Sequence, residues 1–341
     1  MKILMISPHS SWGGASFANI TIAKMLVNCG NEVIYSDEYF PDAEYDGIEI
    51  NHTPFHRQRS KLKCLFIQYV ITSNIDVIMW SPAMALYYIK DILILKRKGV
   101  KHFSILHSLS LDRTIKGHVV DFLESIALSV LNGNVYVSNY TLRSWSKYIF
   151  IRNSKNIKKV IYNAIKMPEV RVPKECNTSK SKLGFVGRFS TEKQPEMFCQ
   201  LSKFIGYELH AFGDGHLLNA LKTKYPNVYF HGLIKNQEAI YSQIDVLIMT
   251  SKFENCPMVI LEAMSRGIPC VVPNVGGIPE IVSDKEGVVY DVFDIDVIDK
   301  SVKIILNDYT NFSRRCIEKV EHYTYDATSK RWIDFINLLN K

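Results

Sequence analysis

Two glutamates, Glu254 and Glu262, lie eight residues apart around the predicted start of a short helix. Pro257 suits the first helical position, and Gly267 provides a stop signal. At 1.5 Å of rise per residue, the two carboxylates are expected roughly 10 Å apart along the helix axis, with the unpaired N–H groups of residues 257–259 between them. This spacing suits a nucleotide-sugar, with ribose on one acid, hexose on the other and diphosphate at the positive helix end.

Two cations follow a predicted strand in the second half of the chain. The strand at 182–187 is expected to place Arg188 and then Lys193 in the loop that precedes the next helix. An arginine fork and a lysine point charge at a strand end are well suited to a diphosphate, and a surface charge pair is the alternative. Gly213, at the end of another predicted strand, would let the backbone approach a nucleotide closely.

A double glycine, Gly13 and Gly14, separates the first predicted strand from the first helix. Such a turn allows close approach of a ligand, and the following helix offers its N-terminus to phosphate. A dinucleotide-binding turn, with Asp37 and Glu38 as the ribose acids, is a second interpretation, although the G-x-G-x-x-G spacing is absent. A plain tight turn is the third.

Two histidines end predicted strands. His107 follows the strand at 101–106, at the carboxyl end where ligands of open α/β sheets collect. His231 ends the strand at 227–231. For each histidine, a structural role is the alternative to a functional one.

The pair Glu254 and Glu262 resembles the E-x7-E signature of the retaining glycosyltransferases of family four, which have the GT-B architecture. The resemblance extends along most of the chain, from Gly13 and Gly14 to the Gly276-Gly277 pair. It implies that Glu262 holds the ribose and that Glu254 lies near the transferred sugar.

The resemblance also assigns roles to the other residues. Arg188 and Lys193 would bind the diphosphate leaving group, and His107 would lie beside the donor sugar and the acceptor. Family members often have glycine next to the first acid, where this chain has Asn255, so its contacts to the sugar hydroxyls are expected to differ. The implied donor-binding set is Gly13, Gly14, Arg188, Lys193, Gly213, His231, Glu254, Asn255, Cys256, Pro257, Met258 and Glu262.

The composition of the 341 residues, 47% hydrophobic and 22% charged, is that of a soluble globular protein of about two domains. No signal peptide is evident, and no apolar run approaches the roughly 20 residues of a spanning helix. The seven cysteines lack CxxC pairing, which indicates thiols in a reducing cytoplasm. Asp294 and Asp296 look like a D-x-D metal motif, but they are interpreted as a helix cap. With no other ligand cluster in the sequence no metal is expected, and a nucleotide-sugar would be a substrate rather than a cofactor.

Basic residues concentrate in the first half of the chain. Residues 51–165 contain 17 Lys and Arg against 5 Asp and Glu. The clusters at 57–63 and 96–101 have apolar neighbours, a pattern that fits docking on an anionic membrane. An amphipathic helix with solvated lysines fits equally well. No motif of a nucleic-acid-binding module accompanies them, so nucleic acid is not an expected partner.

Short apolar runs alternate with amphipathic segments twice, which predicts an α/β protein with two Rossmann-like parallel-sheet domains. In the GT-B architecture these domains face one another across a cleft. We expect an acceptor-binding domain at 1–165, a linker at 166–181 and a nucleotide-sugar-binding domain at 182–325. The final helix, at 326–341, is expected to cross back onto the first domain.

The expected function is a metal-independent retaining glycosyltransferase of hexosyl or N-acetylhexosaminyl type. The resemblance implies a nucleoside diphosphate sugar as donor, usually a UDP-sugar, and a glycan or lipid-linked acceptor of a bacterial surface polysaccharide. The enzyme would work in the cytoplasm or on the inner face of the membrane. A nucleotide-sugar epimerase of the same architecture and an NAD-dependent oxidoreductase that uses Gly13, Gly14 and Asp37 are the alternatives.

Overall fold

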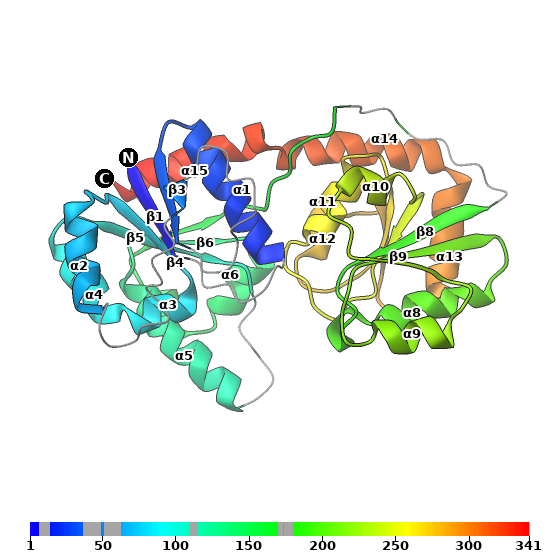
Figure 1. Ribbon diagram of the computed structural model, residues 1–341, viewed down its shortest axis with the longest axis horizontal. Helices are drawn as coiled ribbons and strands as arrows, with labels where there is room; N and C mark the ends of the chain where they lie inside the picture. Colours follow the sequence, from blue (N-terminus) through cyan, green and yellow to red (C-terminus); the bar gives the residue numbers. More distant parts are fainter. Residues whose placement is uncertain are drawn as a thin grey trace. The chain divides into compact units, whose positions relative to one another are not determined.

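The structure of the chain, a computed structural model, describes residues 1–6, 14–36, 49–50, 63–108, 115–169, 173 and 180–340. The chain forms two units: unit 1 comprises Met1–Ala164 and Tyr325–Lys341, and unit 2 comprises Ile165–Thr324 (Figure 1). Unit 2 is thus inserted between the body of unit 1 and its last helix. Most of the predicted linker, at 170–172 and 174–179, lies outside the described residues.

Unit 1 is built on a seven-stranded parallel sheet with the order β3-β2-β1-β4-β5-β6-β7. The central strands are buried apolar runs, because helices cover a parallel sheet on both faces. The first predicted strand is confirmed as Lys2–Ile6, and the strand predicted at 101–106 is confirmed with the same bounds. The full set is β1 (Lys2–Ile6), β2 (Glu32–Ser36), β3 (Glu49–Ile50), β4 (Val77–Trp80), β5 (Lys101–Leu106), β6 (Gly133–Tyr136) and β7 (Ile157–Val160).

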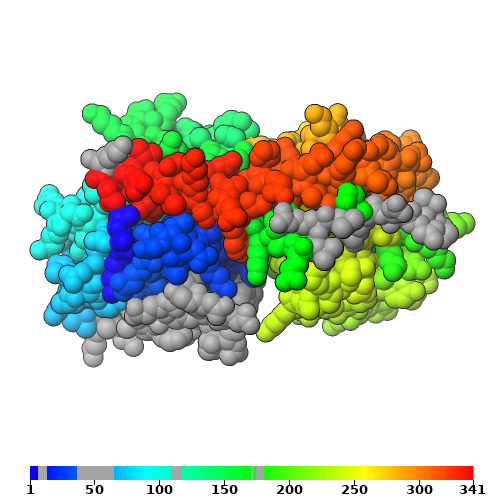
Figure 2. All heavy atoms as spheres, turned by 90° about the horizontal axis from the view of Figure 1, so that it is seen from above, coloured from blue at the N-terminus to red at the C-terminus, as the bar shows by residue number. Residues whose placement is uncertain are grey.

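Helices α1 and α15 lie side by side on one face of this sheet, and α2 to α5 lie on the other (Figures 1 and 2). The amphipathic segment at 83–97 predicts a single helix, and this prediction is wrong: Tyr88 leaves the helical conformation while its ring packs into the core against Phe66 and Trp80. The helices are α1 (Gly14–Asn28), α2 (Lys63–Thr72), α3 (Pro82–Tyr87), α4 (Ile89–Arg97), α5 (Ile115–Val130), α6 (Asn139–Trp145), α7 (Ile149–Asn153) and α15 (Tyr325–Leu339).

Unit 2 contains a six-stranded parallel sheet with the order β10-β9-β8-β11-β12-β13. The order reverses between β8 and β11, as it does between β1 and β4 in unit 1. Both sheets therefore have the doubly wound topology of a Rossmann fold. The strands are β8 (Ser181–Val186), β9 (Tyr207–Phe212), β10 (Tyr229–Gly232), β11 (Val246–Ile248), β12 (Cys270–Pro273) and β13 (Gly287–Tyr290).

The helices of unit 2 connect these strands and cover the sheet. The cap interpretation of Asp294 is confirmed, because its side chain accepts a hydrogen bond of 2.7 Å from the N–H of Asp296 at the start of α13. The helices are α8 (Pro195–Cys199), α9 (Leu218–Lys224), α10 (Gln237–Tyr241), α11 (Met258–Met264), α12 (Ile278–Ile281), α13 (Ile295–Asn307) and α14 (Tyr309–Val320), with 3₁₀ turns η1 (Thr191–Lys193), η2 (Gln200–Lys203) and η3 (Glu321–Tyr323).

The last helix, α15, packs against unit 1 through one apolar stripe. Trp332 and Phe335 are buried, and their rings lie 6.2 and 5.4 Å from the ring of Phe103 on β5. Leu339, four residues after Phe335, is also buried and extends the stripe. Leu338 is only partly buried, because it lies about 100° from Leu339 around the helix axis and so outside the buried stripe.

We predict that Phe335→Ala destabilises unit 1 by about 3–5 kcal/mol, since it removes a buried ring from this contact. All four tryptophans belong to the sequence of unit 1, so tryptophan fluorescence during urea unfolding monitors this unit. Ile333→Ala, on the same helix with 39% of the side chain exposed, is the control and should cost much less. Equal small losses in both variants would show that α15 contributes little to the core of unit 1.

Candidate functional site

The candidate site of unit 2 lies where the strand order reverses. Strands β8 and β11 are hydrogen-bonded neighbours, and the chain leaves them in opposite directions along the sheet. In open α/β sheets, the loops at the carboxyl ends of two such strands form the ligand site. Arg188 and Lys193 follow β8, and Glu254 follows β11, so the topology brings the loops of all three residues together.

The loop after β8 is fixed to the loop after β11 by hydrogen bonds to its main-chain carbonyls. The buried Thr250 hydroxyl donates to the carbonyl oxygens of Lys193 and Gln194, at 2.8 and 2.9 Å. The N–H of Lys252 donates to the carbonyl of Glu192 at 2.8 Å. Gln194 adopts a left-handed conformation, with φ of 46°, before Pro195 starts α8. The backbone that carries Lys193 is therefore held on both sides.

Lys193 and Glu254 form an ion pair across the two loops. Their side chains are only 22% and 12% exposed, so solvent screens this pair less than a surface pair. Arg188 is 66% exposed and lies 3.6 Å from the Glu192 carboxylate. The Ser190 hydroxyl, with help from the two cations, holds the pKa of Glu192 below its usual value. Lys193 is thus anchored, while Arg188 extends into solvent.

The Gly276-Gly277 pair, which follows β12, supports the backbone of Glu254. Gly276 has φ of +60°, and a Cβ there would lie 1.6 Å from the Glu254 carbonyl oxygen. The N–H of Gly277 donates to the same oxygen at 3.2 Å. Only glycine allows this approach, so the pair positions the loop of the first acid.

The Gly213 turn packs against the loop that carries Arg188. Gly213 has φ of +130°, and a Cβ there would lie 2.0 Å from the carbonyl oxygen of Gly187. The N–H of Phe189 donates to the carbonyl of Asp214 at 2.9 Å. The structure therefore gives Gly213 a packing role beside β8, and its proposed contact with a nucleotide stays a prediction.

Both carboxylate oxygens of Glu262 accept hydrogen bonds from α10. Gln237 Nε2 donates to Oε1 at 2.9 Å, and the hydroxyl of Tyr241 donates to Oε2 at 2.7 Å. Arg266 donates to the main-chain carbonyl of Glu262 at 2.9 Å, and its guanidinium lies 5.0 Å from the centre of the Tyr241 ring. Glu262 therefore has a fixed orientation without a direct ion pair to its carboxylate in the described chain.

Burial raises the pKa of Glu262, while the Tyr241 hydroxyl and the Arg266 charge oppose that rise. Burial raises the pKa of Tyr241 well above its usual value, so this hydroxyl remains a donor at neutral pH. Gln237, Tyr241 and Arg266 were not predicted as site residues. No local motif marks them, because Gln237 and Tyr241 reach Glu262 from a separate helix.

His231 belongs to a stack of rings on β9 and β10. Its ring lies parallel to those of Phe212 and His210, with centroids 4.4 and 5.2 Å away. Its Nε2 is 3.0 Å from Nδ1 of His210, so one of these two nitrogens donates to the other. Burial lowers the pKa of both histidines, which keeps them neutral at pH 7. The structure thus gives His231 ring partners, while its donor role is untested.

The start of α11 differs from the prediction. Pro257 is the extended residue that caps the helix, and the first helical residue is Met258. The predicted donors at 257–259 are therefore wrong in part: proline has no N–H group, and the seven-residue helix begins one position later. Cys256 and Met258 are buried, whereas Asn255 is partly exposed. Any contact of Cys256 or Met258 with a donor would involve mainly their backbone.

Unit 1 contains the remaining predicted site residues. His107 follows β5, and its Nε2 lies 2.7 Å from Oδ1 of Asn19 on α1. This contact fixes the ring, and the catalytic role of His107 stays a prediction. Gly14 is the first residue of α1, whereas Gly13 lies outside the described residues, as do Asp37 and Glu38.

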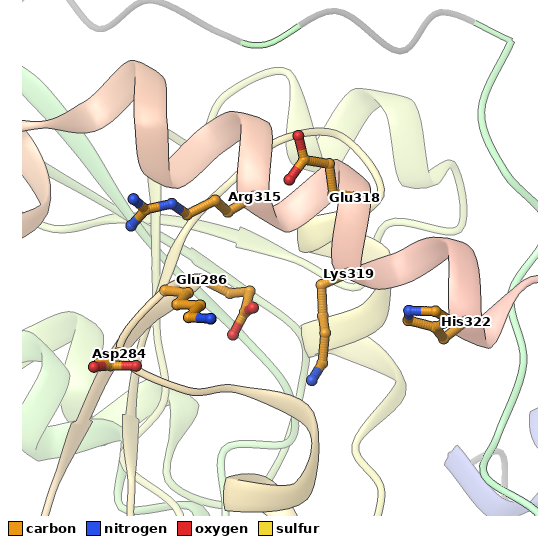
Figure 3. A pocket seen from close by; sticks show the side chains of 7 residues that line it. Asp284, Glu286, Arg315, Glu318, Lys319 and His322 are labelled. Carbon is orange, nitrogen blue, oxygen red and sulfur yellow. The ribbon is translucent and has the colours of Figure 1, made fainter.

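A hollow of about 590 Å³ lies elsewhere in unit 2 (Figure 3). Arg315 and Lys319 line it from α14 and His322 from η3, opposite the loop at 284–286. That loop leads into the amino end of β13, whereas ligands of open α/β sheets bind at the carboxyl ends. The hollow is therefore separate from the candidate site.

The described residues contain no group of three or more His, Cys, Asp or Glu side chains placed to hold a metal ion. None of their helices combines the length and apolar character needed to cross a bilayer.

The boundaries of unit 2 coincide with a family match. Residues 166–323 match the family model described as "Glycosyl transferases group 1". Unit 2 is therefore similar to the group 1 glycosyltransferases. The architecture of the whole chain is the GT-B fold: the Anabaena protein Alr3699/HepE, solved in complex with UDP, has a TM-score of 0.76 over 99% of this chain and all of that chain, at 16% identity.

Relatives with named roles match part of the chain. The O-antigen biosynthesis glycosyltransferase WbnH of Escherichia coli is 33% identical over 174 residues, which are 47% of this chain and 51% of WbnH. An uncharacterized 41.2 kDa protein from the cps region of Klebsiella pneumoniae is 26% identical over 67% of this chain and 69% of its own length. The match to WbnH thus spans about half of that relative.

We predict that Tyr241→Phe destabilises unit 2 by about 1–3 kcal/mol, because it leaves one Glu262 oxygen buried without its donor. Tyr225→Phe is the matched control, since its hydroxyl donates to Glu196 at 3.2 Å near the surface. Thermal unfolding should show a clear loss for the first variant and almost none for the second. Equal losses would contradict a special role for the Glu262 contacts.

Proposed function

We propose that the chain is a retaining glycosyltransferase that transfers a sugar from a UDP-sugar to a hydroxyl of a glycan or lipid-linked acceptor. The observation that carries this proposal is the partly buried ion pair of Lys193 and Glu254 at the strand reversal of unit 2, which is similar to the group 1 glycosyltransferases. The UDP bound by the Anabaena protein supports the choice of nucleotide. The name of the E. coli relative supports an acceptor of bacterial surface polysaccharide synthesis.

Glu262 is proposed to bind the ribose. A carboxylate has about four lone-pair sites, and Gln237 and Tyr241 use one on each oxygen. One site on each oxygen thus remains for the two ribose hydroxyls. Because both protein donors are neutral, the carboxylate keeps its charge for a strong hydrogen bond with the ligand.

Lys193 and Arg188 are proposed to bind the diphosphate. As the bond between the sugar C1 and the phosphate oxygen breaks, negative charge grows on the leaving phosphate. Fixed cations aimed at that charge stabilise the transition state without reorganisation. Glu254 directs the Lys193 ammonium group through their ion pair, and we propose that Glu254 lies near the transferred sugar. Because these two cations can neutralise the diphosphate, we propose that transfer requires no metal.

The reaction is proposed to occur on one face of the sugar. The acceptor oxygen forms its bond to C1 on the face that the phosphate leaves, so the anomeric configuration is retained. The leaving phosphate takes the proton of the acceptor hydroxyl. Glu254 then positions Lys193 and balances its charge. The mechanism does not require Glu254 to attack the sugar.

Lys193→Ala and Glu254→Ala are each predicted to reduce the rate of transfer about a hundredfold, since each disturbs about 3 kcal/mol of charge stabilisation. The measurement is UDP release from UDP-sugars in the presence of a lipid-linked glycan fraction, with and without a chelator. Lys203→Ala is the matched control, because Lys203 forms an exposed ion pair of 3.1 Å with Asp296 in the same domain. Near-normal rates for the first two variants would exclude the proposed site.

Among nucleoside diphosphates, UDP is predicted to raise the melting temperature most. A ligand at a hundred times its Kd adds about 2.7 kcal/mol of stability, which a thermal-shift assay with UDP, GDP and ADP will detect. Glu262→Gln should reduce the shift with UDP. A larger shift with GDP or ADP would overturn the choice of nucleotide while leaving the transfer reaction open to the rate test.

A further inference from the structure

Six large apolar side chains are exposed together on α5 and α7 of unit 1. Val119 and Ile149 are 53% and 51% exposed, and Phe122 is 44% exposed. Monomeric soluble proteins rarely expose contiguous apolar surface unless it binds something. The α5–α7 patch consists of Val119, Val120, Phe122, Leu123, Ile149 and Phe150.

The α5–α7 patch is one surface rather than scattered residues. The rings of Phe122 and Phe150 meet edge to face, with centroids 5.5 Å apart. The hydroxyl of Tyr148 donates to Asp121 Oδ2 at 3.2 Å and so ties the start of α7 to α5. Figure 1 shows α5 projecting from the rest of unit 1 at the end that carries the patch.

The charges around the patch are almost all positive. Residues 125–168 contain seven Lys and Arg and no Asp or Glu. Arg143, Lys147, Arg152 and Lys155, on and beside α6 and α7, are exposed. The two acids of α5 are withdrawn from the surface: Asp121 is 2% exposed, and burial next to Asp121 raises the pKa of Glu124 to about 7.

We infer that the α5–α7 patch docks unit 1 on an anionic lipid surface. Phe, Leu, Ile and Val beside lysine and arginine are the residues that insert into the interface of an anionic bilayer. A protein partner fits less well, since lysine is depleted from protein interfaces. A glycan fits less well too, because aliphatic side chains offer it no hydrogen bonds.

The basic cluster at 96–98 is the competing surface. Tyr88 and Ile92, two of its apolar neighbours in sequence, are buried in the core, and Lys96 donates to the carbonyl of Val130 at 2.7 Å. Only Leu93 and Ile94 of α4 are among the exposed large apolar residues there. The apolar surface of α4 is thus smaller than the α5–α7 patch.

Flotation of the full chain with vesicles tests this inference without any donor, so its failure is distinct from failure of the proposed function. The vesicles contain phosphatidylcholine alone or phosphatidylcholine with phosphatidylglycerol. Phe122→Ser with Phe150→Ser should weaken binding to the anionic vesicles more than about tenfold, through lost apolar burial. Arg152→Glu with Lys155→Glu should weaken it at least about 30-fold, and added salt should weaken the wild type.

Two controls make the result specific. Ile205→Ser with Val292→Ser removes two apolar side chains of unit 2 that are more exposed than Phe122 and Phe150, and it should leave binding unchanged. Charge reversal at Lys96, Arg97 and Lys98 tests the competing surface. The inference is overturned if the wild type does not bind anionic vesicles or if both patch variants bind them normally. It is also overturned if only the variant at 96–98 loses binding. Unchanged melting temperatures will verify that each variant is folded.

Discussion

The hydrogen bonds of Thr250 to the carbonyls of Lys193 and Gln194 hold the candidate site together. They join the loop after β8 to the loop after β11, and so set the position of Lys193 relative to Glu254. With its backbone held, Lys193 meets Glu254 before any ligand arrives. Charges arranged in advance cost no reorganisation during a reaction.

The two acids at the site differ in their partners. Glu254 is neutralised by a cation and supported by the glycine pair after β12, whereas neutral donors orient the Glu262 carboxylate. An acid already paired with a cation is suited to sharing that cation with an incoming phosphate. An acid held by an amide and a phenol has lone pairs left to accept hydrogen bonds from hydroxyl groups.

The sequence was most informative where one segment contains the signal. Buried apolar runs located β1, β5 and β9, and the cap at Asp294 was evident from its position before an amphipathic helix. Contacts between distant segments were not predictable. Tyr241 reaches Glu262 across 21 residues, and the break at Tyr88 arises from core packing. Pro257 was misplaced by one position, because proline also fits the extended residue before a helix.

The left-handed backbone of Gln194 has a cost that unit 2 must offset elsewhere. A residue with a Cβ loses about 1–2 kcal/mol in this conformation, out of a total folding stability of about 5–15 kcal/mol. The conformation of the loop that carries Lys193 therefore lowers the folding stability of unit 2 while it keeps the backbone next to Lys193 rigid. Selection for heat resistance alone would favour glycine at this position, at the expense of the rigidity that aims the ammonium group.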